Sequence, residues 1–179
     1  MIISVAVTGV LMVFTNSVRG SADPLVRKQA MAIAESMLNE VMAQAYTYCD
    51  PQDPANAATT PPASTAACTG GAAGSQDKGG STLGPQPGTE GRFNPTDPLD
   101  NVADYNGYTM NSGIYGLDNG ATPVAALAAY SASVTVTRAG TMFSLPNDAV
   151  LRVDVRVTGR GETITLTGYR FRYAPNSTG

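Results

Sequence analysis

The sequence predicts an α+β fold, in which a long N-terminal helix packs on a C-terminal antiparallel β-sheet and a long loop lies between them. Apolar residues recur at helical spacing over residues 23–47 and alternate with polar residues over 130–174. Residues 48–129 show neither period and contain most of the prolines. A chain of 179 residues is long enough for one domain with a real core, so we expect a single globular domain over 23–179.

The first 22 residues form an apolar segment. The run MIISVAVTGVLMVF (residues 1–14) carries no charge, and no basic residue precedes it as in a signal peptide. Its 14 residues would rise about 21 Å as a helix, which is short of the roughly 30 Å hydrocarbon core of a bilayer. We interpret residues 1–22 as the remainder of a longer apolar helix that serves as a membrane anchor and stalk. The expected stalk and assembly side chains are Ile2, Ile3, Val5, Val7, Val10, Leu11, Val13 and Phe14.

A one-sided helix follows this segment without a flexible linker. Asp is a preferred helix N-cap and Pro is favoured at the first helical position, so Asp23 and Pro24 predict a break or kink in one continuous rod. Beyond this break, apolar side chains recur on one helical face at Val26, Ala30, Ile33, Ala34, Met37, Leu38, Val41 and Ala45. The predicted amphipathic helix covers residues 23–47.

The two cysteines, Cys49 and Cys68, flank a segment rich in Pro, Ala, Thr and Gly. A disulfide between them would close a loop of about 20 residues and stabilise the fold by roughly 3 kcal/mol through the unfolded state. The alternative is two unrelated buried thiols. A disulfide implies an oxidising compartment, so we expect a periplasmic or extracellular domain.

Three aspartates, Asp97, Asp100 and Asp104, lie close together in a stretch rich in turn residues. Oxygen ligands of this kind are those that Ca²⁺ prefers. Their spacing does not match an EF-hand loop, and Asp is common in turns for backbone reasons alone. We keep the three residues as weak calcium candidates and predict no metal site and no cofactor.

Three runs with a period of two, at residues 132–138, 149–158 and 162–173, predict an antiparallel sheet with one buried face. A turn at residues 160–161 would place Val157 opposite Ile164 and Val155 opposite Leu166, which keeps apolar residues together.

In the last run, the aromatic residues at 169, 171 and 173 have the opposite parity to Ile164. We therefore predict a bulge or twist at Gly168 that restores the apolar side. Arg170 and Arg172 would then face solvent.

Composition argues against two classes of function. The net charge is −3 and the basic residues are scattered, whereas nucleic-acid binding normally needs a basic face. The chain has no histidine, so neither a Ser-His-Asp triad nor a histidine-bearing zinc site can form. We find no converging acid, base or nucleophile, and we predict no enzyme, no small-molecule substrate and no nucleic-acid partner.

The chain resembles the type IV pilin family, which includes the pseudopilins of type II secretion. The resemblance is carried by IISVAVTGVLMVF (2–14), SADPLVRKQAMAIAESMLNEV (21–41), YCDP (48–51) and DNVADYNGY (100–108). The first two segments are similar to the family as a whole. The last two are similar to minor pilins of mannose-sensitive haemagglutinin (MSHA) pili.

The resemblance implies a pilin-like fold and a minor structural subunit that acts in fibre assembly or at the tip, and so in surface attachment. The chain would be held in the inner membrane with a periplasmic domain and then packed into a cell-surface pilus. Its partners would be the major pilin and other minor pilins. A type II secretion pseudopilin and a membrane-tethered adhesive module that binds a ligand through the 50–100 loop are the alternatives.

The chain departs from the family pattern at its start. Pilin precursors carry a basic leader, a glycine cleavage site and a mature start similar to Phe-Thr-Leu-Ile-Glu, and none of these precedes Met1. The glutamate that pairs with a neighbouring subunit's N-terminus is therefore missing. Either Met1 is an internal methionine of a longer reading frame or the chain has been trimmed, and we favour the first because the apolar run is short by about the right length.

Overall fold

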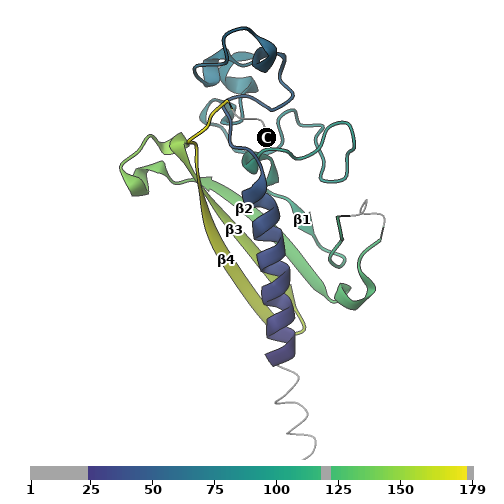
Figure 1. Cartoon of the computed structure of the whole chain (residues 1–179). Coiled ribbons are helices and arrows are strands. Elements are labelled where there is room, and N and C mark those ends of the chain that lie inside the picture. The colour runs from purple at the N-terminus through teal and green to yellow at the C-terminus, as the bar shows by residue number, and fades with distance from the viewer. Residues whose placement is uncertain (1–23, 118–121, 177–179) are drawn as a thin grey trace, which may run out of the picture.

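The structure is a computed structural model that describes residues 24–117 and 122–176. In these residues it shows an α+β fold, with one long helix, a four-stranded antiparallel sheet and a long loop region between them (Figure 1). The predicted class and order of elements are confirmed at this level. The predicted anchor at 1–22, with its stalk residues from Ile2 to Phe14, lies outside the described residues, as does Asp23.

The described part of the helix covers residues 24–43. Its buried apolar residues match the predicted face and are Ala30, Ile33, Ala34, Met37 and Val41. The described helix ends four residues before the predicted boundary at 47 because another segment binds the backbone of Ala45. The Ala45 amide donates to Asp100 O (3.3 Å), and Val102 N donates to Ala45 O (2.9 Å). Both backbone groups of Ala45 are thereby satisfied outside the helix.

The sheet has the strand order β1-β2-β3-β4, and neighbouring strands are antiparallel. The strands are β1 (Thr109–Met110), β2 (Tyr130–Arg138), β3 (Val150–Gly159) and β4 (Glu162–Phe171). The last three correspond to the three predicted runs. The sequence does not predict β1, since two residues are too few to show a period.

The pairing of β3 with β4 confirms the predicted hairpin register. Val157 lies opposite Ile164, and Val155 lies opposite Leu166. The turn at residues 160–161 has positive φ at both positions, 52° and 87°. Tight hairpin turns with two positive φ angles match the right-handed twist of the strands that they join.

Of the bulge or twist predicted at Gly168, the bulge is wrong. The two strands stay in register without interruption, from Gly159 opposite Glu162 to Val150 opposite Phe171. A Cβ atom added to Gly168 would lie 3.2 Å from Leu38 Cδ1 and 3.2 Å from Met42 Sδ. The missing side chain at 168 therefore leaves room for the side chains of Leu38 and Met42, and such close approach is a second common reason for glycine inside a strand.

The aromatic side chains beyond Gly168 have partners on the other face of the sheet. The ring of Phe143, from the connection between β2 and β3, lies 5.3 Å from the ring of Tyr169 and 5.0 Å from that of Phe171, centroid to centroid. Both pairs have edge-to-face geometry, which is favourable for aromatic rings. This small outer cluster makes a bulge unnecessary.

Arg170 and Arg172 do not face solvent as predicted. Arg170 Nη2 donates to the carbonyl of Gln44 just beyond the helix (3.0 Å), where a cation is favourable. The side chain of Arg172 is only 5% exposed. It donates to Asp148 Oδ2 (2.8 Å) and to the hydroxyl of Tyr46 (2.9 Å). Both arginines therefore join the end of β4 to the segment that leaves the helix.

Buried residues of the helix, the loop and the sheet belong to one hydrophobic cluster. It includes Ile33, Met37 and Val41 from the helix, Leu99 and Val102 from the loop, and Val134, Val153, Val155 and Val157 from the sheet. Figure 1 shows the helix running alongside the sheet, with the loop region gathered at the end where the helix stops. The loop is therefore the region where the polar groups of interest collect.

Candidate functional site

Cys49 and Cys68 form the predicted disulfide, with their Cα atoms 5.2 Å apart. Asp53 strengthens this tie, since its carboxylate accepts from Thr69 N (2.9 Å) and from Thr69 Oγ1 (2.6 Å). The first part of the loop is thus fastened near the end of the helix.

The loop needs such ties because it buries little apolar surface. Between residues 51 and 98, a range that the structure describes completely, the buried apolar side chains are only those of Pro62, Cys68 and Leu83. Short 3₁₀ turns form much of its regular structure, among them η1 (Pro54–Ala57) and η3 (Gly71–Gly74). Polar groups must therefore hold much of the loop, and they gather at two places.

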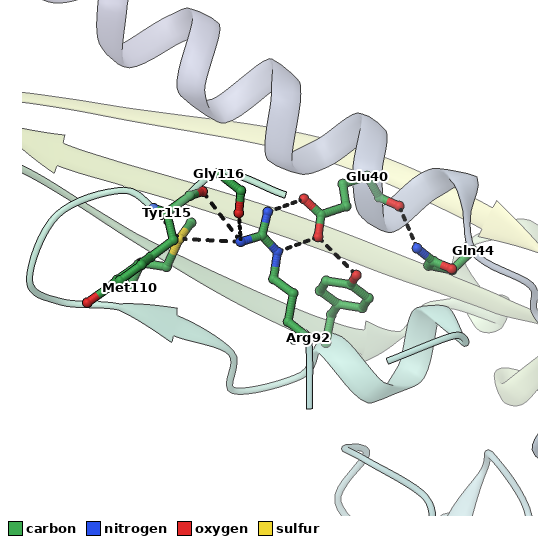
Figure 2. A network of polar contacts seen from close by, with 7 residues as sticks. Glu40, Gln44, Arg92, Met110, Tyr115 and Gly116 are labelled. Atoms are coloured by element: carbon green, nitrogen blue, oxygen red, sulfur yellow. Dashed lines mark hydrogen bonds and ion pairs between the residues drawn. The ribbon is translucent and has the colours of Figure 1, made fainter. Parts of the chain in front are cut away.

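The first place is an ion pair between the loop and the helix, shown in Figure 2. Arg92 Nε lies 2.5 Å from Glu40 Oε1, and Arg92 Nη2 lies 2.7 Å from Glu40 Oε2. The side chains of Arg92 and Glu40 are only 5% and 14% exposed. A bidentate pair of this kind is the strongest arrangement of an arginine with a carboxylate.

Neighbouring groups complete the network around this pair. Arg92 Nη1 donates to the carbonyls of Tyr115 (3.4 Å) and Gly116 (3.3 Å). The hydroxyl of Tyr105 donates to Glu40 Oε1 (3.1 Å). Burial alone would lower the pKa of Arg92, but the hydrogen bonds and charge of Glu40 raise it. The charges at this place are paired within the chain.

The second place is a cluster of four carboxyl groups, from Asp50, Glu90, Asp100 and Asp104, which we call the carboxylate cluster. One oxygen from each of Asp50, Glu90 and Asp100 lies within 4.8 Å of the others. The charge of Asp104 raises the pKa of Glu90, so the Asp104 carboxyl group lies near these three. Asp50 is 5% exposed and Asp104 is 1% exposed. Three separate segments of the loop region therefore meet here.

Local backbone structure positions several of these side chains. Asn101 caps the 3₁₀ turn η5 (Val102–Tyr105), and Asp104 Oδ2 accepts in return from Asn101 N (2.8 Å). This reciprocal arrangement is a capping box. Asp50 Oδ1 accepts from Gln52 N (2.6 Å) in a local turn. In each case one oxygen is held by backbone. The other oxygen of Asp50 accepts from Gln76 Nε2, and the other oxygen of Asp104 has no partner.

The charges of the carboxylate cluster are not balanced within the chain. Burial raises the pKa of Asp100 to about 6, with further contributions from the charges of Asp50 and Asp97. Burial also raises the pKa of Asp50, Glu90 and Asp104, and the largest charge effects on each come from other carboxylates. At pH 7 the four groups oppose one another's ionisation.

Three buried oxygen atoms at this place have no hydrogen-bond partner. They are Asp100 Oδ1, Asp104 Oδ1 and Gln76 Oε1. Gln76 is fully buried, and its Nε2 donates to Asp50 Oδ2 (3.3 Å), which places the amide beside the cluster. All three atoms are acceptors, and no described residue offers a donor to any of them.

The structure brings together two of the three predicted calcium candidates, Asp100 and Asp104. Asp97 lies at the edge, where its Oδ2 accepts from Thr89 Oγ1. Asp50 and Glu90 are not among the candidates predicted from the sequence, because no periodic or spacing signal links residues that lie 40 positions apart. The one hint is that Asp50 directly follows Cys49, which the disulfide holds in place.

Comparison with known proteins gives no relative from which to read a function. No protein-family model, curated protein or solved structure matches the chain significantly. None of the helical structure in the described residues has both the length and the apolar character needed to cross a membrane. The role of the chain has to be inferred from its residues and their geometry.

Proposed function

We propose that this chain is a minor structural subunit of a type IV pilus-like fibre of the MSHA kind, acting in fibre assembly or at the tip. The observation that carries the proposal is a continuous arrangement along the chain. An uncharged apolar run (1–14) is followed by a short polar stretch containing Arg19, then by Asp23-Pro24 and a one-sided helix, described over 24–43, and an antiparallel sheet. A stalk joined directly to a globular head suits a subunit that packs into a fibre by its helix.

The proposal includes packing of the helix across the apolar face of the sheet. Three observations support it: the shared hydrophobic cluster, the room that Gly168 leaves for Leu38 and Met42, and the hydrogen bond from the hydroxyl of Tyr130 to Gln29 Oε1 (2.8 Å). The helix would then be held along much of its described length. Packing of this kind would fix the orientation of the globular domain relative to the stalk.

The start of the described helix also fits a role in assembly. Leu25 is 59% exposed, although it lies directly after Pro24 at the junction with the apolar segment. An exposed leucine alone is unremarkable on a protein surface. Here it would extend the apolar stalk, and the major pilin and other minor pilins would cover it in the fibre.

The disulfide supports the proposed location. Disulfides persist in oxidising compartments, so the head would lie in the periplasm while the stalk is held in the inner membrane. Extraction into the fibre would then bring the head to the cell surface.

The test is the location of the full chain in the bacterium that encodes it. An epitope-tagged copy replaces the native gene, surface fibres are sheared off, and the fibre and envelope fractions are probed for the tag. We expect the chain in the fibre fraction, and we expect gene deletion to change fibre number or attachment.

Two single variants make the test specific to the stalk. Leu11→Lys places a charge in the apolar segment, at a cost of about 2.5–3.5 kcal/mol in a membrane, and should remove the chain from fibres. Leu117→Lys is the matched control, since Leu117 is 78% exposed in the head, and it should assemble normally.

The alternatives give different results. Retention of the chain in the envelope with loss of secretion on deletion would indicate a pseudopilin. Retention with ligand binding and normal fibre number would indicate a tethered adhesive module. Either result would contradict the pilus proposal.

A further inference from the structure

We propose that Asp50, Glu90, Asp100 and Asp104 form a calcium site that links the long loop to the segment following the helix. This inference rests on the described residues and is independent of the proposed function. Three features of the cluster support it: the spacing of the carboxylate oxygens, the buried oxygens without a hydrogen-bond partner, and the lack of a basic side chain beside the carboxylates.

The spacing of the oxygens suits a single calcium ion. Ca²⁺ binds oxygen ligands at 2.3–2.6 Å, so two ligands on opposite sides of the ion lie up to roughly 5 Å apart. The oxygens of Asp50, Glu90 and Asp100 lie within 4.8 Å of one another, which allows all three to contact one ion. Mg²⁺ binds at about 2.0–2.1 Å in near-ideal octahedral geometry and usually keeps several waters. The spacing allows either ion, but a site made mostly of protein carboxylates suits calcium better than magnesium.

The unpartnered atoms point independently to a ligand. Asp104 is 1% exposed, and its Oδ1 has no hydrogen-bond partner although Oδ2 is engaged in the capping box. Asp104 is near enough to Glu90 for its charge to raise the pKa of Glu90, so this carboxyl group belongs to the same cluster. Buried polar atoms without a partner are rare in folded proteins and call for an explanation. A cation beside Asp104 would supply the missing partner.

Neither the basic side chains of the loop nor Arg138 at the end of β2 supply the missing charge. Arg92 is bound by Glu40, and Arg138 Nε lies 2.5 Å from Asp77 Oδ1. Lys78 Nζ donates to the carbonyl of Pro85 (2.7 Å). Burial and mutual repulsion disfavour four ionised carboxyl groups at one place. A divalent cation removes that penalty and lets the carboxylates ionise as ligands.

The position of the site explains what the ion would do. Asp50 follows the disulfide, Glu90 belongs to the later part of the loop, and Asp100 and Asp104 belong to the segment that pairs with Ala45. One ion would therefore connect three segments that share little buried apolar surface. The disulfide reaches only to residue 68, so the ion would fasten the part of the loop beyond it.

The first test is calcium binding to the full 179-residue chain. Thermal unfolding and isothermal titration calorimetry are measured in EGTA, in 10 mM CaCl₂ and in 10 mM MgCl₂. If the dissociation constant is about 10⁻⁴ M, calcium should raise Tm by about 5 °C or more, and magnesium should raise it much less. Equal stabilisation by both ions would overturn the assignment to calcium, and no response to either would overturn the site.

The second test separates a ligand from a structural residue. Glu90→Gln should weaken calcium binding at least tenfold, yet in EGTA its Tm should equal or exceed that of the wild-type chain because one repelling carboxylate is gone. In calcium the order of the two Tm values should reverse. Glu35→Gln is the matched control, since Glu35 is exposed on the helix, and it should bind calcium normally. A Glu90→Gln variant with wild-type affinity, or with a lower Tm in EGTA, would overturn the proposal.

Discussion

Glu90 and Arg92 lie two positions apart in the sequence, yet Arg92 belongs to a paired set of buried charges and Glu90 to an unpaired one. Arg92 neutralises Glu40 in a buried bidentate pair whose neighbours are also hydrogen-bonded. Glu90 enters a cluster of four carboxyl groups in which three neighbouring oxygens lack a partner, one of them on Gln76. A buried charge needs a partner in both cases. At the first site the chain contains that partner, whereas at the second we infer that it comes from solution.

The largest expected effect on stability comes from removing Arg92, which leaves a buried carboxylate without a partner, as in the carboxylate cluster. Arg92→Met leaves Glu40 buried without its partner, which should cost about 3–5 kcal/mol of unfolding free energy, measured by chemical denaturation. Arg156→Met, at an exposed position of β3, is the matched control and should change stability by less than about 0.5 kcal/mol.

A double variant identifies the cause of that loss. Glu40→Met with Arg92→Met removes both charges and should recover most of the lost stability, because an apolar pair of similar volume is often neutral. If the double variant were as unstable as Arg92→Met, packing and not charge would explain the loss.

Removal of the disulfide should have the next largest effect. Cys49→Ser with Cys68→Ser should lower the unfolding free energy by about 3 kcal/mol, since the unfolded chain loses its closed loop. Because Asp50 follows Cys49, this double variant should also bind calcium more weakly than the oxidised wild-type chain. Calcium titration calorimetry of both proteins checks this, and equal affinities would show that the disulfide and the carboxylate cluster are independent.

The proposed packing of the helix on the sheet can be tested at Gly168. Gly168→Val would place atoms where Leu38 and Met42 already lie, and should cost about 1–3 kcal/mol of unfolding free energy by overpacking. Thr165→Val lies on the exposed face of the same strand and should be nearly neutral. Denaturant unfolding of both variants distinguishes them, and similar values would contradict close packing of the helix at this strand.

The smallest expected effect is at the edge of the carboxylate cluster. Asp97→Asn removes a charge whose carboxylate accepts from Thr89 rather than contacting the other members. It should change stability by less than about 0.5 kcal/mol and leave calcium affinity within about threefold. A tenfold loss of calcium affinity in the same calorimetric titration would show that Asp97 is one of the ligands.

Sequence reasoning predicts the fold well wherever the signal is periodic. The helix face and the register of the last hairpin follow from spacing alone, because each has one apolar side. The same reasoning fails at Gly168, Arg170 and Arg172. There the partners of β4 come from the helix, from Tyr46 and from Asp148, and parity within one strand carries no information about them.

The candidate site is predicted only in part for a related reason. Asp100 and Asp104 stand out because they are neighbours in a turn-rich stretch, and Asn101 and Asp104 form a local capping box. Asp50 and Glu90 join them through the folding of an aperiodic loop. Their proximity depends on the disulfide and on the pairing of Ala45 with the 100–102 segment.

By itself, the sequence determined the order of elements, the apolar faces and the presence of a long loop held by two cysteines. Those properties depend on the periods of the helix and the strand, which are local. Only the tertiary structure decided which buried charges are paired and which are not. That outcome depends on distances between residues far apart in the chain. It explains why Arg92 lies in a fully paired site with Glu40, whereas Glu90, two positions earlier, lies in a cluster of carboxylates without a basic partner.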